Sequence, residues 1–254
     1  MRELAHRGFA GVAPENTLAA VAAAAERADG VEVDVQPASD GTPVVFHDHR
    51  LDDGGESRGV TDATGFVWDA SPAALREADV LGSGEGVPEL AEVAAAVPAD
   101  TVLHVELKSP GVETTIGGSG PGELRWRPFV ERVAAALGAA DAPVVFSSFF
   151  DGALAAAREA APGVPRAALC LDGDRGLDRA REFGCAAIHP PVDAVDASLV
   201  ERAHGQNCAV NVWTVETWRE ALQCRDAGAD GVITDYPGVT EFAETAEGRP
   251  DYER

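Results

Sequence analysis

The chain has 254 residues, and its 43 Asp and Glu residues so outnumber its 20 Lys and Arg residues that the formal net charge is -23. This charge argues against nucleic acid or an anionic membrane surface as a partner, because both require a basic protein surface. It suits a halophilic, salt-rich cytosol, where the repulsion between surface charges is screened within about 3 Å at 1 M salt. The polar first eight residues do not resemble an export signal and no apolar run could cross a bilayer, so we expect a cytoplasmic protein without stable membrane insertion.

Apolar runs of strand length recur eight times along the chain: Leu4–His6, Val31–Val35, Thr101–Leu107, Val144–Ser148, Ala167–Leu171, Ala186–His189, Cys208–Trp213 and Gly231–Thr234. Helical stretches lie between most of them: Thr17–Ala28, Pro88–Val97, Trp126–Leu137, Gly152–Ala160, Ser198–His204 and Glu216–Asp226. Eight repeats of strand and helix without a break in composition predict an α/β fold, a closed (β/α)₈ TIM barrel that forms one domain over residues 1–254.

Two irregular regions interrupt this repeat. Pro43–His47 follows the second strand across Asp40-Gly41, which is a hairpin signal, so we expect a ribbon there. Residues 48–87 are rich in Gly and Asp, contain a short helix near Pro72–Ala78, and are predicted to be a small insertion after the second strand. The Gly-rich stretch 109–123 is predicted to be a mobile loop. Both regions follow strands, so both are expected on the rim where barrel active sites lie.

Three carboxylates in this pattern predict a metal site. Glu32 and Asp34 are two residues apart, so a strand places both on one face while the intervening valines take the other. Glu106 adds a third carboxylate from the neighbouring strand. Like charges in a low-dielectric site favour a shared cation, and oxygen ligands without a nearby cysteine favour one divalent cation, Mg²⁺ or Ca²⁺, over zinc. The alternative is that some of them form structural salt bridges with Arg7 or Lys108.

Two histidines are candidates for general acid and base. His6 is followed by Arg7, and His47 is followed by Asp48, so the two imidazoles bracket the carboxylate pair in the chain. Imidazole exchanges protons near neutral pH, as phosphodiester cleavage requires. Lys108 is the single lysine of the chain, which indicates either a wanted point charge or chance. For the remaining residues we expect rim structure at His189, a turn or a functional role at Asp235, and no role for His49, His104 and His204.

These residues belong to a longer ordered set: His6-Arg7-Gly8, Pro14–Thr17, Glu32-Val33-Asp34, His47-Asp48, Glu106-Leu107-Lys108, Val212–Val215 and Gly231–Pro237. The set resembles the signature of the glycerophosphodiester phosphodiesterase family over nearly the whole chain. The resemblance implies a phosphoric diester hydrolase of lipid metabolism. Such an enzyme hydrolyses a small-molecule glycerophosphodiester to glycerol 3-phosphate and an alcohol.

The resemblance also implies a role for each matching residue: a metal site at Glu32, Asp34 and Glu106, an acid/base pair at His6 and His47, phosphate binding by Arg7 and Lys108, and packing of Trp213 against the glycerol side. Within Pro14–Thr17 we expect Asn16 or Thr17 to cap the first helix and Glu15 to orient a neighbouring ligand.

One segment departs from the family pattern. After His47-Asp48 the family continues with a leucine, a basic residue and threonines, whereas here Leu51 is followed by Asp52–Gly55 and the threonines come later. This departure leaves the alcohol preference open.

Three alternatives remain at this point. A lysophospholipase D-like diesterase would need a larger apolar rim, for which Phe66, Trp68 and Trp126 are the candidates. A non-catalytic phosphate-binding barrel would lack a histidine or a metal ligand, and none is missing. A phosphosugar isomerase or aldolase would need a Schiff-base lysine deep in the barrel and a Gly-rich phosphate grip after the last two strands. The oligomeric state stays open.

Overall fold

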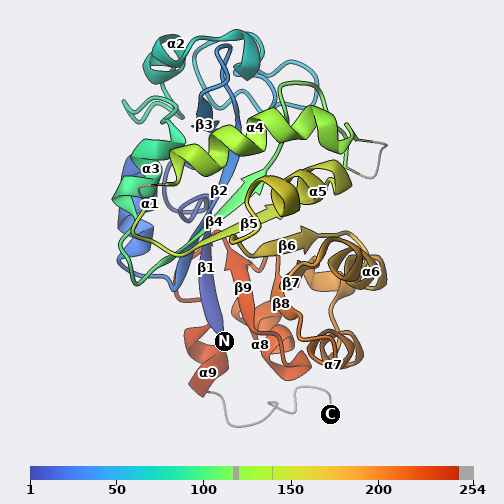
Figure 1. Ribbon diagram of the computed structural model, residues 1–254. Helices are drawn as coiled ribbons and strands as arrows, with labels where there is room; N and C mark the ends of the chain where they lie inside the picture. The colour runs from blue at the N-terminus through green and yellow to red at the C-terminus, as the bar shows by residue number, and fades with distance from the viewer. Residues whose placement is uncertain (117–119, 139, 246–254) are drawn as a thin grey trace.

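Eight parallel strands close into a barrel in the computed structural model, which describes residues 1–116, 120–138 and 140–245 (Figure 1). The first strand, β1 (Arg2–His6), pairs with both β2 (Gly30–Pro37) and β9 (Gly231–Thr234), so the barrel has no free edge. The other barrel strands are β4 (Val102–Leu107), β5 (Val144–Ser148), β6 (Arg166–Leu169), β7 (Ala187–His189) and β8 (Ala209–Val212). The predicted TIM barrel is confirmed.

Helices surround the barrel: α1 (Leu18–Ala25), α3 (Leu90–Ala96), α4 (Glu123–Ala136), α5 (Asp151–Ala160), α6 (Gly173–Phe183), α7 (Ala197–His204), α8 (Trp218–Ala227) and α9 (Glu241–Thr245), with the 3₁₀ turn η2 (Val192–Ala194). The α1 helix begins where the Thr17 hydroxyl accepts a hydrogen bond from the Ala20 amide, at 3.2 Å. Thr17 is therefore the cap expected for the first helix. None of the described helices combines the length and the apolar character needed to span a bilayer.

The α6 helix did not emerge from the sequence pattern. Its apolar positions are few, with Leu177, Ala180 and Phe183 facing the core between charged residues. Asp172 caps this helix by accepting a hydrogen bond from the Arg175 amide at 2.9 Å. A sparse apolar stripe among aspartates and arginines therefore concealed a helix that packs well.

Residues 48–87 form an arm beyond the barrel, at the top of Figure 1. The strand β3 (Pro43–Val45) pairs antiparallel with β2, and Gly41 takes a positive φ of 85° in the connecting turn, so the predicted ribbon is confirmed. The arm carries η1 (Val67–Asp69) and α2 (Pro72–Glu77). Together with the base of the ribbon it has a small core of its own: Ala38, Val44, Phe46, Leu51, Val60, Val67, Leu75, Val80 and Val87.

Of the predicted mobile loop, residues 117–119 lie outside the described residues.

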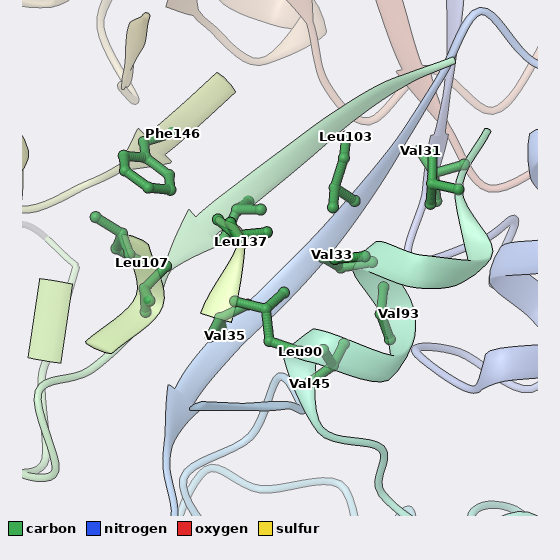
Figure 2. Close-up of a cluster of buried hydrophobic side chains, with 14 of the residues drawn as sticks. Val31, Val33, Val35, Val45, Leu90, Val93, Leu103, Leu107, Leu137 and Phe146 are labelled. Carbon is green, nitrogen blue, oxygen red and sulfur yellow. The ribbon is translucent and has the colours of Figure 1, made fainter. Parts of the chain in front are cut away.

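The outer face of β2 is apolar. Figure 2 shows Val31, Val33 and Val35 directed toward α3, where Leu90 and Val93 meet them. All five side chains are fully buried, and truncating one such leucine to alanine costs about 2–5 kcal/mol. Because side chains alternate along a strand, burying the valines on this face directs Glu32 and Asp34 into the barrel interior.

Candidate active site

The register between β2 and β4 brings the three predicted metal ligands together. Asp34 lies directly opposite Glu106, and Glu32 lies one inward position below Asp34 on the same face. One carboxylate oxygen from each residue lies within 4.8 Å of the other two. All three side chains are buried, Asp34 completely. The barrel therefore gathers three negative charges at one point of its interior.

Two cationic side chains lie against these carboxylates. Lys108 Nζ is 3.1 Å from Glu106 Oε1 and 3.5 Å from Asp34 Oδ1, and Arg7 Nε is 3.1 Å from Asp34 Oδ2. Nevertheless, within the described part of the chain, Asp34 Oδ1 and Glu106 Oε1 accept no hydrogen bond of good geometry. The salt bridges that we considered as an alternative are present, and Lys108 contacts both of these oxygens as an ion-pair partner.

The electrostatics of the three carboxylates reflect this crowding. Burial, reinforced by the charges of Asp34 and Glu106, raises the pKa of Glu32 well above its ordinary value. Burial also raises the pKa of Glu106 to about 7, although the ammonium of Lys108 opposes the shift. Buried oxygens without hydrogen bonds and carboxyls with raised pKa values both indicate that the site fits a cation. The oxygen donors, with no sulfur ligand among them, fit a hard divalent ion.

Asn16 holds Asp34 in place. Its side-chain amide donates to Asp34 Oδ2 at 2.9 Å, and its Oδ1 accepts from the Asp34 backbone N–H at 3.3 Å. Asn16 takes a positive φ of 59°, which asparagine tolerates better than most residues. The helix cap falls to Thr17, so Asn16 serves the carboxylate instead.

Each predicted acid/base histidine is oriented by a carboxylate. His6 Nδ1 lies 2.6 Å from Asp235 Oδ1, and His47 Nδ1 lies 2.6 Å from Asp48 Oδ1. In both residues this leaves Nε2 available, and His6 Nε2 lies 4.0 Å from Glu32 Oε2. Burial lowers the pKa of His47 to about 4, even though the charge of Asp34 opposes the shift. Asp235, which the sequence left between a turn and a functional role, has a direct contact with His6.

A cavity of about 130 Å³ opens above these groups and has an apolar wall. Trp213 and Phe149 meet edge to face in that wall, with ring centroids 5.5 Å apart, and the Trp213 indole N–H donates to the His189 carbonyl at 2.6 Å. A second cavity of about 540 Å³ continues from it past His47 and Lys108 toward the arm. Phe149, which follows directly after β5, was not singled out in the sequence, because an aromatic residue at that position carries no chemical signature.

Arg58, in the arm, is a further residue of the site that was not predicted from the sequence. Its guanidinium donates to Glu15 through both terminal nitrogens, at 2.7 and 2.6 Å, and its Nε donates to Asp48 at 3.1 Å. Glu15 in turn accepts from Arg7 Nη1 at 3.2 Å. Burial acts to raise the pKa of Glu15, but the hydrogen bond from Arg58 and the charge of Arg7 hold it below its ordinary value. Glu15 thus contacts two arginines, not one of the metal-site carboxylates.

The sequence matches the model of the glycerophosphoryl diester phosphodiesterase family over residues 6–239. The chain belongs to this family. A glycerophosphodiester phosphodiesterase of Caldanaerobacter subterraneus is 30% identical over 248 residues, which cover 92% of this chain and 93% of the relative. The resemblance found in the sequence is confirmed, and the chain is a phosphoric diester hydrolase of the glycerophosphodiester phosphodiesterase class.

Solved structures of the family share the barrel. A phosphodiesterase of Oleispira antarctica, in complex with the product sn-glycerol-3-phosphate, superposes with a TM-score of 0.83 at 27% identity and covers 97% of both chains. A putative glycerophosphoryl diester phosphodiesterase of Silicibacter pomeroyi gives 0.80 at 28% identity, over 96% of this chain and 92% of that one.

The family placement favours a diesterase over the isomerase, aldolase and non-catalytic barrels considered above. The structure also places the three aromatic residues that were candidates for the apolar rim of a lysophospholipase D-like diesterase. Trp126 lies fully buried in α4, where it stacks on Phe150, so it is a core residue. Phe66 and Trp68 stack on each other in the arm with ring centroids 4.8 Å apart. We see no broad apolar rim built from these three aromatic residues.

Proposed function

We propose that this member of the family hydrolyses glycerophosphodiesters to glycerol 3-phosphate and an alcohol, with one divalent cation, Mg²⁺ or Ca²⁺, held by Glu32, Asp34 and Glu106. The observation that carries the proposal is the convergence of these three carboxylates within 4.8 Å of one another, beside His6 and His47. The Oleispira antarctica phosphodiesterase, solved with sn-glycerol-3-phosphate, supports the same product class.

The charges of the site support the cation. In the fully ionised form that binds a cation, the three carboxylates carry three negative charges and Arg7 and Lys108 return two positive ones, so this form without the ion repels an anionic diester. One divalent ion reverses the sign and leaves a single positive charge for a phosphodiester monoanion. Bound there, the ion would supply Lewis-acid stabilisation of the charge on the phosphoryl oxygens.

The two histidines would handle the protons. Asp235 and Asp48 accept from Nδ1 of His6 and His47, so each ring turns its Nε2 toward the cavity. One imidazole takes a proton from the attacking oxygen, and the other gives a proton to the oxygen of the leaving alcohol. A carboxylate behind each ring fixes its tautomer and stabilises the imidazolium that forms.

The remaining predicted residues would bind the substrate. Arg7 and Lys108 lie within the small cavity and can donate to the phosphoryl oxygens as negative charge grows there. Trp213, with Phe149 against its face, offers an apolar wall to the carbon skeleton of the glycerol. The larger cavity past His47 is the space for the alcohol.

Release of glycerol 3-phosphate from several glycerophosphodiesters tests the proposal, measured with and without chelator and at about 0.15 and 1 M salt. We expect turnover that a chelator abolishes and that Mg²⁺ or Ca²⁺ restores. His6→Ala and His47→Ala should each lower kcat by roughly 10²–10⁴-fold without unfolding the protein.

His204→Ala is the matched control, because His204 lies on α7 and pairs with Asp230 at the surface. Its kcat should equal that of the wild type. Undiminished turnover in the presence of chelator would overturn the metal site, and undiminished turnover of either catalytic-site variant would overturn the acid/base assignment.

A further inference from the structure

Arg58, in the arm, bridges the loop after β1 and the first residue of the arm. It lies beyond β3, in the segment that departs from the family pattern, and its side chain reaches Glu15, after β1, and Asp48, at the start of the arm. Its guanidinium forms a two-pronged ion pair with Glu15, after β1, at 2.7 and 2.6 Å. Its Nε and its own backbone N–H both donate to Asp48, at 3.1 and 2.7 Å.

Both carboxylates are buried, and each has a second partner in the candidate active site. Asp48, with 4% of its side chain exposed, is bonded to His47 Nδ1 at 2.6 Å. Glu15, with 9% exposed, accepts from Arg7 Nη1 at 3.2 and 3.4 Å. The guanidinium of Arg58 is therefore linked to the imidazole of His47 through Asp48, and to the guanidinium of Arg7 through Glu15.

We propose that Arg58 is a positioning residue for the reaction, which fixes His47 through Asp48 and Arg7 through Glu15; the inference rests on the proposed function. The planar fork of arginine matches this task, because it satisfies two carboxylates in fixed directions, whereas a lysine ammonium is a single point charge. Without Arg58, Glu15 keeps Arg7 as its side-chain partner among the residues that the structure describes, and draws it away from Asp34, to which Arg7 Nε lies at 3.1 Å. Asp48 at the same time loses the cation that balances its charge behind His47.

A purely structural role is the competing explanation, since Arg58 also ties the arm to the barrel. The two roles differ in what they predict for kcat. If Arg58 only held the arm to the barrel, its removal would lower the stability of the arm and weaken substrate binding at the larger cavity. KM would then rise. If Arg58 positions the reactive groups, its removal lowers kcat in protein that is still folded, because the imidazole of His47 and the guanidinium of Arg7 leave their reactive geometry.

The test compares the metal-loaded wild type with Arg58→Ala, Arg58→Lys and the control Arg76→Ala. Arg76 is an arm arginine that also pairs with two carboxylates, Glu89 and Glu92, but contacts none of the candidate site residues. We expect kcat to fall about 10–100-fold in Arg58→Ala, the range for residues that orient a reactive group, with KM changed less. Arg58→Lys should recover thermal stability but not kcat, and Arg76→Ala should keep the wild-type kcat.

A second readout does not depend on turnover. The tautomer of His47, observed in long-range ¹H–¹⁵N spectra of the imidazole, should be a single Nδ1–H form in the wild type and a mixture in Arg58→Ala. A wild-type kcat in folded Arg58→Ala, a full recovery of kcat by lysine, or an unchanged His47 spectrum would each overturn the inference. An inactive wild type would instead contradict the proposed function, and the His47 spectra would then still decide the role of Arg58.

Discussion

The barrel interior holds two buried clusters of titratable side chains that differ in kind. The upper one, at the candidate active site, contains three carboxylates with two cations beside them. The lower one is uncharged: His104 and His189 lie with ring centroids 5.8 Å apart, and Asn211 Nδ2 lies 3.1 Å from His189 Nε2. His104 precedes Glu106 by two residues on β4, so both side chains face the same interior.

The two clusters differ in whether their buried side chains stay charged near neutral pH. In the lower cluster burial lowers the pKa of His104 to about 4 and that of His189 well below its ordinary value, so both rings are neutral near pH 7. In the upper cluster burial also disfavours charge, yet the surrounding cations keep the pKa of Asp34 below its ordinary value despite that burial. Retained charge therefore distinguishes the carboxylate cluster at the candidate active site from the pair of buried histidines.

Removing one charge from the upper cluster should produce the largest effect. Glu32→Gln keeps the shape of the side chain but deletes a ligand and one like charge. We expect kcat/KM to fall by roughly 10³-fold, the size of losing several kcal/mol of charge stabilisation, while the melting temperature of the metal-free protein rises. Kinetics and calorimetry on the same preparation measure both. A lower melting temperature together with intact activity would show that Glu32 is a structural salt-bridge residue.

Lowering the pH should reduce the stability that the lower cluster gives to the protein. The ordinary pKa of histidine is about 6.5, and that of His104 in the fold is about 4, so the unfolded chain takes up the proton first as pH falls. The stability that this ring contributes is complete above about pH 6.5 and is lost toward pH 4, by about 3 kcal/mol. Because the pKa values of Glu32 and Glu106 shift in the opposite sense to that of His104, the measurement is the difference in unfolding free energy between the wild type and His104→Leu from pH 7 to pH 4. A pH-independent difference would mean that His104 is not a buried neutral ring.

The partners of the histidines sharpen the same contrast. His6 is bonded to the carboxylate of Asp235, whereas His189 is bonded to the amide of Asn211. Asp235→Asn would give His6 the kind of partner that the structural histidine has. We expect kcat to fall about 10–100-fold with KM little changed, because the amide neither fixes the tautomer nor stabilises the imidazolium. A wild-type kcat in this variant would remove Asp235 from the machinery.

The barrel and the carboxylate cluster could be predicted from the sequence because both follow from short periodicities. Glu32 and Asp34 share a face through the two-residue repeat of a strand, and the parallel register with β4 adds Glu106. The same rule would have placed His104 inside the barrel, since it stands two residues before Glu106. His189, expected on the rim, is buried beside it.

The residues that position the histidines could not be predicted in this way. Asp235 is 229 residues from His6, and Arg58 is 43 residues from Glu15, so only the folded barrel brings them together. Arg58 carries no local signal and lies in a segment that departs from the family pattern, whereas Asp235 lies within Gly231–Pro237, where the sequence left both a turn and a functional role open. Ligand sets on one strand can be predicted from spacing, whereas the partners that orient them are tertiary contacts.

The smallest expected effect concerns the lower cluster at neutral pH. Within the described part of the chain, neither ring nitrogen of His104 has a hydrogen-bond partner, and a buried polar atom without a partner costs about 1–3 kcal/mol. His104→Leu replaces the ring by an apolar side chain of similar size, so we expect the free energy of unfolding at pH 7 to rise by about 1 kcal/mol. Turnover should not change, because His104 is not among the residues that line the catalytic cavity. Chemical denaturation with a parallel assay separates the two results. A loss of activity with unchanged stability would mean that the lower cluster serves the reaction, and the division between a charged functional cluster and a neutral structural one would fail.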